Sequence, residues 1–450
     1  MIRNDRPMIS IVMPVHNGGK YLKLAVNDIL CQTDTDFEFI AVEDGSEDKS
    51  RAFLQNTQLI HKQLKVICQD NMGGGSARNT GLAEARGRYV LFLDDDDRFE
   101  HTLVEELKEQ LNRLNPDILV FGGDRFHNGM SKTFASPALL CTGVLSEESQ
   151  EKKILTEYDC QNAILKFTNT TVWNKVFRKD FLIKHHIMFQ SNPGNDTLSF
   201  TLTALCCAQK IGYYEKILVH YQEGNPEGQI ANQYKWPTSI YKALLDGKEA
   251  LELRGKLLIY KSAFVRYAVQ KCMSRLEMIQ SFNGQRELYQ LLHDYGIQKL
   301  GLTEKELKES GAEMYIDKIR RIRMYSYEEY LYKRFALIQG TGLLCRTVYR
   351  LPKLGIEERA RVVLYGCGNV GKSYYIQLIN QKKYRIVLWV APDYEQILFC
   401  VSSVEQIFTA GFDYIVLAEE DEASALNVKE FLISRGIDDN KIIWIPPEII

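Results

Sequence analysis

Residues 89–93 form an apolar run that ends abruptly in four consecutive aspartates, Asp94–Asp97. Side chains alternate sides along an extended strand, so Asp94 and Asp96 are expected to point the same way from its carboxyl end. Adjacent carboxylates repel one another, and a hard divalent cation such as Mg²⁺ or Mn²⁺ relieves that repulsion because it prefers oxygen ligands. The run therefore predicts a cation-binding strand end, with a solvated acidic turn as the alternative.

Two further apolar segments, residues 9–17 and 39–48, also end in polar residues, and residues 20–31 between them have the pattern of a helix. This order predicts a β-α-β unit of an α/β fold with a parallel sheet. Ligands bind open α/β sheets beyond the carboxyl ends of the strands. We therefore expect Pro14, Asn17 and Asp44 to be neighbours of the four aspartates.

Five blocks in this part of the chain stand in a recognisable order: Pro14-Val15-His16-Asn17, Gln32-Thr33, Val42-Glu43-Asp44-Gly45-Ser46, Asn71 to Gly81, and Phe92 to Asp97. Together they resemble the family-2 glycosyltransferases, which are inverting, nucleotide-sugar-dependent enzymes with the GT-A fold. The resemblance covers about the first half of the chain. It implies a Rossmann-like mixed sheet and a nucleotide-sugar donor, with a UDP-sugar expected.

The resemblance also implies roles for single residues. Asp44 would accept a hydrogen bond from the nucleotide base, and Arg78 would contact the nucleotide, with a surface ion pair as its alternative. The remaining donor contacts would be Pro14, His16, Asn17, Gly73, Asp94 and Asp95, and the metal ligands would be Asp94, Asp96 and His220. The alternative for His220 is a polar residue that is hydrogen-bonded at a strand end without a functional role. The alternative for Glu43 is a solvent-facing residue at a strand end, and the alternative for residues 73–75 is a flexible turn.

A glycosyl transfer needs a base that takes the proton of the acceptor hydroxyl. The resemblance places this base at Asp196, downstream of the block Trp173-Asn174-Lys175. The alternative for Asp196 is the N-cap of the following helix. The chain departs from the family pattern in four places: His16 stands in the usual Tyr place, Glu43 replaces Asp, Asn195 replaces Glu, and Gln222 replaces Arg. Glu43, Asn195 and Gln222 are the reason to keep a catalytically inactive protein as an alternative.

The composition excludes some classes of protein. The 450 residues suggest several domains, and the net charge of −2 predicts no bulk affinity for nucleic acid. The cysteines show no CxxC pair, and no apolar run is long enough for a membrane span, which favours a cytoplasmic protein with reduced thiols. A peripheral association with the inner membrane face is the open alternative for the location.

The second half of the chain predicts two further regions. Residues 236–355 have the pattern of amphipathic helices, for example over residues 241–253 and 256–278. Residues 318–353 hold nine Lys or Arg against two Glu. Such a segment could bind an anionic membrane, with a solvated helical face as the alternative. Residues 356–450 contain Gly366, Gly368 and Gly371 after a strand, a pattern typical of a Rossmann-like domain. Since Ala391 stands where a ribose-binding carboxylate is wanted, this domain is not expected to bind NAD.

These observations predict three domains: a GT-A catalytic domain over residues 1–235, a helical region over 236–355, and a small Rossmann-like α/β domain over 356–450. The expected function is transfer of a sugar to a hydroxyl of a glycan or lipid-linked acceptor in bacterial cell-surface polysaccharide synthesis. Two alternatives remain, a nucleotidyltransferase on a similar sheet and an inactive sugar-nucleotide-binding scaffold. The sequence names neither the sugar nor the oligomeric state.

Overall fold

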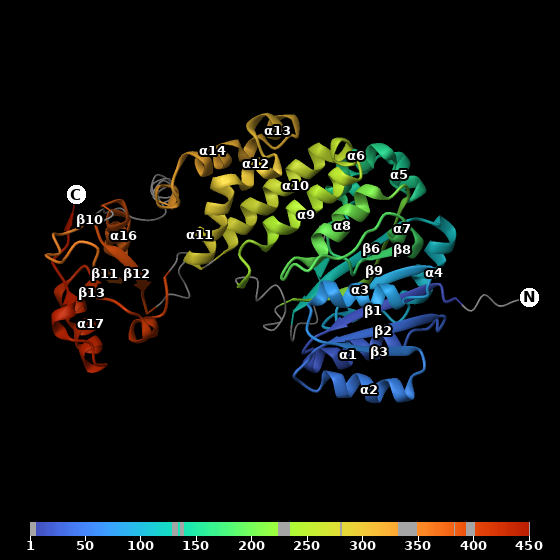
Figure 1. Cartoon of the computed structure of the whole chain (residues 1–450), viewed down its shortest axis with the longest axis horizontal. Coiled ribbons are helices and arrows are strands. Elements are labelled where there is room, and N and C mark those ends of the chain that lie inside the picture. Colours follow the sequence, from blue (N-terminus) through green and yellow to red (C-terminus); the bar gives the residue numbers. More distant parts are fainter. Residues whose placement is uncertain are drawn as a thin grey trace, which may run out of the picture. The chain divides into compact units, whose positions relative to one another are not determined.

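The computed structural model describes residues 6–127, 134–135, 139–223, 235–279, 281–331, 349–381, 383–392 and 401–449. The chain forms two compact units (Figure 1). The first comprises Met1–Arg275 with Tyr295–Ile316, and the second comprises Leu276–Asp294 with Asp317–Ile450. The expected division of the chain at residues 235 and 355 stays a prediction.

One mixed sheet organises the first unit. Within the described residues its strands follow the order β3-β2-β1-β4-β8-β6-β9-β5, with β7 paired to β6. Strands β3, β2, β1 and β4 are parallel, whereas β8 runs antiparallel to both β4 and β6. The strands are β1 (Ile9–Val15), β2 (Phe37–Asp44), β3 (Leu64–Gln69), β4 (Tyr89–Phe92), β5 (Arg98–Phe99), β6 (Ile118–His127), β7 (Phe134–Ala135), β8 (Lys175–Arg178) and β9 (Ile211–Glu223).

Helices cover both faces of this sheet, which is why the parallel strands are apolar on both sides. The first-unit helices are α1 (Gly19–Leu30), α2 (Ser50–Ile60), α3 (Gly74–Glu84), α4 (Leu103–Leu114), α5 (Glu147–Lys152), α6 (Glu157–Phe167), α7 (Lys179–Lys184), α8 (Asp196–Cys207), α9 (Ser239–Leu253), most of α10 (Leu257–Met278), α12 (Ile297–Leu300) and α13 (Glu304–Glu309). On one face, Ile11 of β1 shares a core with residues of α1, α2 and α4. On the other face, a Cβ at Gly81 of α3 would lie 2.3 Å from Val12, so α3 packs directly on β1. The predicted β-α-β unit and the α/β class are confirmed.

Helix α8 positions the predicted base. Eleven of its residues are buried, and it lies beside α9, where Gly247 leaves no room for a Cβ against Leu202. Because the helix is held on all sides, its first residue, Asp196, has a fixed place in the first unit. The predicted helices at residues 241–253 and 256–278 are confirmed as α9 and α10.

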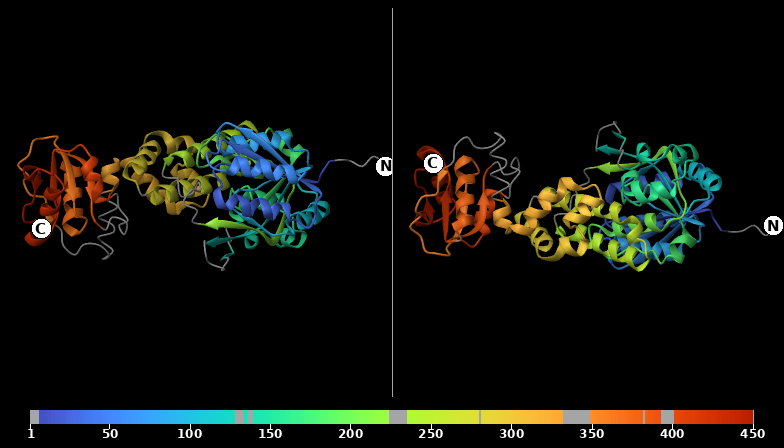
Figure 2. Two further views of the ribbon diagram at one scale, coloured as in Figure 1. Left: turned by 90° about the horizontal axis from the view of Figure 1, so that it is seen from below. Right: turned by 90° about the horizontal axis from the view of Figure 1, so that it is seen from above.

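The second unit contains a small parallel sheet of order β12-β11-β13-β14, shown in red in Figures 1 and 2. Alternate residues of β11 serve two cores: Val362 packs with Val370 and Tyr374 of α16, and Val363 packs with the α17 residue Leu432. The elements are β10 (Tyr349–Arg350), β11 (Arg361–Tyr365), α16 (Asn369–Gln381), β12 (Arg385–Val390), β13 (Tyr414–Leu417), α17 (Glu422–Ser434), β14 (Ile442–Ile443) and β15 (Glu448–Ile449), preceded by α11 (Phe282–Leu291) and α14 (Ile316–Met324). The predicted parallel α/β sheet is therefore present.

The glycine turn of this sheet has the tight geometry that its sequence pattern predicts. Gly366 has φ +101°, and a Cβ at Gly371 would lie 2.1 Å from the carbonyl oxygen of Gly366. Position 391 is a buried Ala at the end of β12, and Asp393 lies outside the described residues. The expectation that NAD does not bind here stays a prediction.

Across the described ranges, no helix combines the length and apolar character needed to cross a bilayer. The basic segment 318–353 is described only in part, because residues 332–348 lie outside the described residues. Its role at a membrane stays a prediction.

Candidate active site

The ends of β1 and β2 are joined by hydrogen bonds between their loops. Nδ1 of His16 lies 2.8 Å from the carbonyl oxygen of Asp44, and Oδ1 of Asn17 accepts a hydrogen bond of 2.8 Å from the backbone N–H of Glu47. Asn17 has φ +55°, a conformation that Asn tolerates better than most residues. The register of β1 against both β2 and β4 places Asp44 and Asp94 at the same edge of the sheet, as predicted.

Asp44 organises the turn that precedes α3. It is 2% exposed, and its carboxylate accepts hydrogen bonds from Nε2 of Gln69 at 2.8 Å and from the backbone N–H groups of Met72 at 2.9 Å and Gly73 at 2.8 Å. A carboxylate offers about four lone-pair sites, so about one remains for a ligand. Asp44 can therefore hold the turn and still accept one further hydrogen bond.

Glu43 is fully buried, so the alternative of a solvent-facing residue is wrong. Its carboxylate accepts hydrogen bonds from Nε of Arg51 at 2.6 Å and from the backbone N–H of Ser46. Burial alone would raise the pKa of Glu43, but these hydrogen bonds outweigh it and lower the pKa. Glu43 therefore fixes the loop after β2, because its ionised carboxylate binds both Arg51 and the backbone N–H of Ser46.

Two of the three glycines before Ser76 have separate structural reasons. Gly73 has φ +85° and precedes the first turn of α3. A Cβ at Gly75 would lie 2.5 Å from the carbonyl oxygen of Gln190 and 3.2 Å from Cβ of Asp196. The alternative of a merely flexible turn is therefore wrong, because α3 packs against the segment that carries Asp196.

Arg78 joins the two acidic regions. Its Nη1 donates to Oδ2 of Asp196 at 2.7 Å, and its Nη2 donates to Oδ1 of Asp94 at 2.6 Å. The Arg78 side chain is 8% exposed, so the alternative of a surface ion pair is wrong. One buried guanidinium thus brings Asp94 and Asp196 into a single site.

The four aspartates differ in their surroundings. The Asp94 side chain is 27% exposed, whereas Asp97 is fully buried and accepts a hydrogen bond of 2.9 Å from the backbone N–H of Gln222. Oδ2 of Asp95 is buried and has no hydrogen-bond partner within the described part of the chain. Burial raises the pKa of Asp95 well above its usual range, and the charges of Asp96 and Asp94 add to this shift. Oδ2 of Asp97 likewise has no partner within the described residues. Clustered carboxylate oxygens of which two are buried and unpartnered fit a hard divalent cation.

His220 of β9 pairs in the antiparallel ladder with Arg98 of β5, the residue that follows the four aspartates. Its Nδ1 lies 2.6 Å from Oδ1 of Asp124 and its Nε2 lies 3.0 Å from Oε1 of Glu100. The ring nitrogens thus face other carboxylates than Asp94 and Asp96. Among the residues that the structure describes, no three His, Cys, Asp or Glu side chains already converge as a metal cage. The metal role of Asp94, Asp96 and His220 stays a prediction.

Asp196 is the first residue of α8, not its N-cap, so the capping alternative is wrong. The N-cap position belongs to Asn195, whose Nδ2 donates to Oγ of Ser239 in α9 at 2.7 Å. Asp196 is 3% exposed, and its Oδ1 has no partner in the described ranges. This oxygen retains its capacity to accept a proton or a hydrogen bond.

Comparison with known proteins identifies this arrangement. Residues 10–181 match the family model described as glycosyl transferase family 2. This part of the chain belongs to that family. The chain is 27% identical over 232 residues to the uncharacterized glycosyltransferase EpsJ of Bacillus subtilis, covering 51% of this chain and 64% of EpsJ. It is 35% identical over 114 residues to the glycosyltransferase GlyG of Streptococcus pneumoniae, covering 25% of this chain and 38% of GlyG.

The chain thus spans less than two thirds of the length of these curated relatives. Among solved structures, residues 1–349 of TarS from S. aureus, crystallised in complex with UDP-GlcNAc, match with a TM-score of 0.53 and 18% identity. The match covers 75% of this chain and 93% of that chain, and at this identity it shows the fold alone. The predicted GT-A fold is confirmed.

Some residues around the site were not found from the sequence. Ser239 orients Asn195, and Phe189 stacks on Phe200 with ring centroids 3.8 Å apart, beneath the Arg78 guanidinium, which lies 5.7 Å from the Phe189 ring. These contacts join segments that are distant in the chain. No local sequence pattern predicts these contacts, because each of these residues is by itself typical of a helix or of a hydrophobic core.

Proposed function

We propose that this chain is an inverting glycosyltransferase that moves a sugar from a nucleotide-diphosphate sugar to a hydroxyl of a glycan or lipid-linked acceptor. A UDP-sugar is the expected donor, bacterial cell-surface polysaccharide the expected product, and the cytoplasm the expected location. One observation carries the proposal: the Arg78 guanidinium contacts both Asp94 and Asp196. The two carboxylates that such a reaction requires therefore share one site.

The donor would lie across the edge formed by β1, β2 and β4. Asp44 would accept the N–H of the nucleotide base at the one lone-pair site that Gln69, Met72 and Gly73 leave open. The loop that contains Pro14, His16 and Asn17 would line the same nucleotide, because hydrogen bonds join this loop to Asp44 and the residues after it. The diphosphate would lie near Asp94 and Asp95.

Asp94, Asp95 and Asp96 would hold the divalent cation, Mg²⁺ or Mn²⁺, through carboxylate oxygens. Once bound, the cation would neutralise the charge that develops on the leaving diphosphate. The raised pKa of Asp95 supports this role, because burial and the nearby charges of Asp96 and Asp94 disfavour its ionised form, which a bound cation would stabilise.

Asp196 would act as the base. Its carboxylate takes the proton of the acceptor hydroxyl while that oxygen bonds to the anomeric carbon, and the bond from this carbon to the diphosphate oxygen breaks on the opposite face. The nucleoside diphosphate leaves, and the anomeric configuration inverts. A donor diphosphate offers competing acceptors for Arg78, so donor binding would loosen its hold on Asp196.

The test begins with thermal stabilisation, because a ligand that binds only the folded protein raises the unfolding temperature. Nucleotide sugars are screened with and without Mn²⁺, and the products formed from the stabilising donor are identified. The proposal predicts release of a nucleoside diphosphate. Release of pyrophosphate in a parallel assay that supplies a nucleoside triphosphate and a sugar 1-phosphate would select a nucleotidyltransferase instead, and stabilisation without any turnover would select the inactive scaffold.

A further inference from the structure

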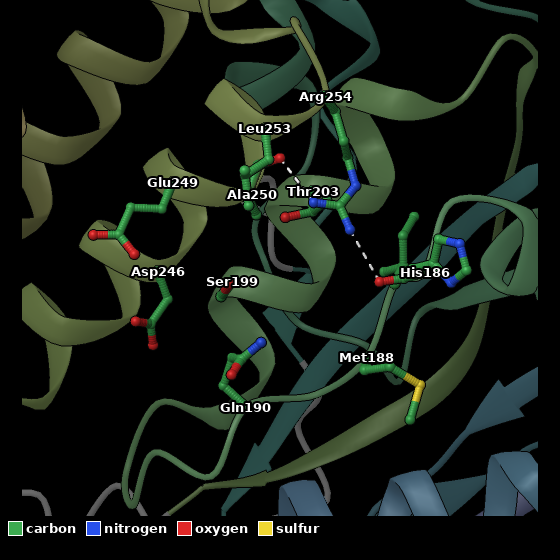
Figure 3. A pocket seen from close by; sticks show the side chains of 11 residues that line it. His186, Met188, Gln190, Ser199, Thr203, Asp246, Glu249, Ala250, Leu253 and Arg254 are labelled. Atoms are coloured by element: carbon green, nitrogen blue, oxygen red, sulfur yellow. Dashed lines mark hydrogen bonds between the residues drawn. The ribbon is translucent and has the colours of Figure 1, made fainter.

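A pocket of about 270 Å³ lies between α8, α9 and the segment 186–190 (Figure 3). Its polar side chains come from three stretches of chain. Ser199 and Thr203 belong to α8, Asp246, Glu249 and Arg254 belong to α9 and its C-terminal end, and Gln190 precedes the loop to the base. The proposed reaction assigns no task to this pocket.

The pocket concentrates unused hydrogen-bonding groups. In the described part of the chain, the side chains of Gln190, Ser199, Thr203 and Asp246 form no hydrogen bond, and Asp246 forms no ion pair even with Lys242 one turn away. Burial raises the pKa of the half-buried Asp246, and the charge of Glu249 adds to this shift. The charge of Lys242 opposes this shift only in part. Asp246 thus lacks the hydrogen bonds that would offset the desolvation of its carboxylate.

The cation that lines the pocket does not neutralise these carboxylates. The Arg254 guanidinium donates to the backbone carbonyls of His185 at 2.9 Å, His186 at 2.9 Å and Ala250 at 2.8 Å. Figure 3 shows Arg254 on the side of the pocket away from Asp246. Arg254 thus ties the segment 185–186 to α9, and the opening of the pocket stays acidic.

The remaining lining is apolar. Ile187, Met188, Ala250 and Leu253 complete the wall, and Met188 and Leu253 are 49% and 86% exposed. A sugar ring presents hydroxyls at its edge and C–H groups on its faces, so it suits a site with carboxylate, amide and hydroxyl groups beside apolar side chains. A phosphate would be repelled by Asp246 and Glu249, and a metal ion would gain nothing from the apolar wall.

The pocket shares its framework with the proposed base. The carbonyl oxygen of Gln190 occupies the space that a Cβ of Gly75 would need, and Ser199 lies one turn after Asp196 on α8. One helical turn rises about 5.4 Å, which is of the order of one sugar ring. A glycan held in the pocket would therefore lie on the helix that carries Asp196.

We propose that this pocket binds a sugar ring of the acceptor, with Asp246 accepting hydrogen bonds from ring hydroxyls. The volume falls below the range of about 300–1,000 Å³ typical of drug-sized ligands, which fits one small ring. The assignment as an acceptor subsite depends on the proposed glycosyl transfer, whereas the binding of sugar does not.

The test is saturation-transfer NMR on the full chain with free glucose, galactose, rhamnose and N-acetylglucosamine, each at millimolar concentration and with saturating UDP to block the donor site. At least one sugar is expected to give a signal, and Asp246→Asn is expected to weaken its binding about tenfold or more, as loss of hydrogen bonds to a charged group does. Glu252→Gln is the matched control, because Glu252 lies on the same helix and pairs with Lys248 at 3.1 Å. Unchanged unfolding temperatures would show that the variants remain folded.

The absence of a signal from all four sugars would overturn the proposal, as would equal signals in Asp246→Asn and the native protein. Stabilisation by Mn²⁺ that is lost in Asp246→Asn would overturn it in favour of a cation site. If no sugar binds but the protein still releases a nucleoside diphosphate from its donor, only the proposed acceptor subsite is ruled out. If a sugar binds but no nucleoside diphosphate is released, the proposed glycosyl transfer is ruled out and sugar binding in the pocket is supported.

Discussion

Nη1 of Arg78 lies 2.7 Å from Oδ2 of Asp196, although 118 positions separate the two residues in the chain. Both side chains are almost fully buried. Removing one partner of such a pair leaves an uncompensated buried charge, which costs about 3–5 kcal/mol. This pair therefore couples the stability of the first unit to the geometry of the proposed base.

Arg78→Gln is expected to lower the free energy of unfolding by about 3–5 kcal/mol, measured by urea denaturation at neutral pH. Arg113→Gln is the control, since Arg113 is exposed and its guanidinium contacts Gln110 on α4. The control should change stability by less than about 0.5 kcal/mol. An equally small effect of Arg78→Gln would contradict the inferred role of the pair.

Gly75→Ala is expected to disturb the site through its backbone. The added methyl group would lie 2.5 Å from the carbonyl oxygen of Gln190, so the segment before Asp196 must shift. Overpacking of this kind costs about 1–3 kcal/mol, and donor turnover should fall with it.

Gly143→Ala is the control for this substitution, because a Cβ there meets no atom within 4 Å and its φ is not positive. It should be neutral or slightly stabilising. Equal unfolding temperatures and equal turnover for both variants would show that close contact between α3 and residue 190 is not needed.

Asp95→Asn is expected to raise the unfolding temperature when no divalent cation is present. Burial and the charges of Asp96 and Asp94 raise the pKa of Asp95, so the folded state binds its proton more tightly than the unfolded state. The ionised side chain therefore destabilises the fold at pH values above the folded pKa, and this penalty vanishes as the pH falls below the unfolded value.

The gain from Asp95→Asn should accordingly be present at pH 8 and shrink on acidification toward about pH 4, as scanning calorimetry in EDTA can measure. The same variant should lose stabilisation by Mn²⁺. A lower unfolding temperature at pH 8 would argue that Asp95 is held by a favourable contact instead.

Asp159 should show the opposite pH dependence. Burial alone would raise its pKa, but hydrogen bonds from Ser149, Ser146 and Thr156 lower it to about 2 from the model-compound value of 3.8. The depressed pKa contributes about 2 kcal/mol of stability above pH 4, which is lost as the pH falls through the folded pKa. Asp159→Asn should therefore cost about that much at pH 7 and little at pH 2. A cost that does not depend on pH would contradict this reading.

The strand pattern predicted much of the fold. The apolar runs before Asn17, Asp44 and Asp94 specified three parallel strands with their polar ends together, because burial on both faces requires unbroken apolar residues. The helices at residues 241–253 and 256–278 followed from amphipathic periodicity. Local pattern could not show that α9 packs beside α8 and holds Asn195 through Ser239.

The candidate site was predictable where the family motifs mark it. The resemblance pointed to Asp94, Asp196 and Arg78, but it did not predict that Arg78 bridges the two carboxylates, since that depends on α3 packing against residue 190. Glu43 looked like a surface residue because it is charged. Its burial follows from Arg51, eight positions later, which supplies the compensating charge.

The proposed base offers the most direct test. Asp196→Asn keeps the size of the side chain but removes its capacity to take a proton, and Asp36→Asn is the control at the opposite end of β2, where Asp36 pairs with Lys108 at 2.9 Å. The measurement is the rate of nucleoside diphosphate release from the stabilising donor, with water as the acceptor hydroxyl. We predict a loss of about 10²- to 10⁴-fold for Asp196→Asn with unchanged donor binding, and no loss for Asp36→Asn. Full activity of Asp196→Asn would contradict the account.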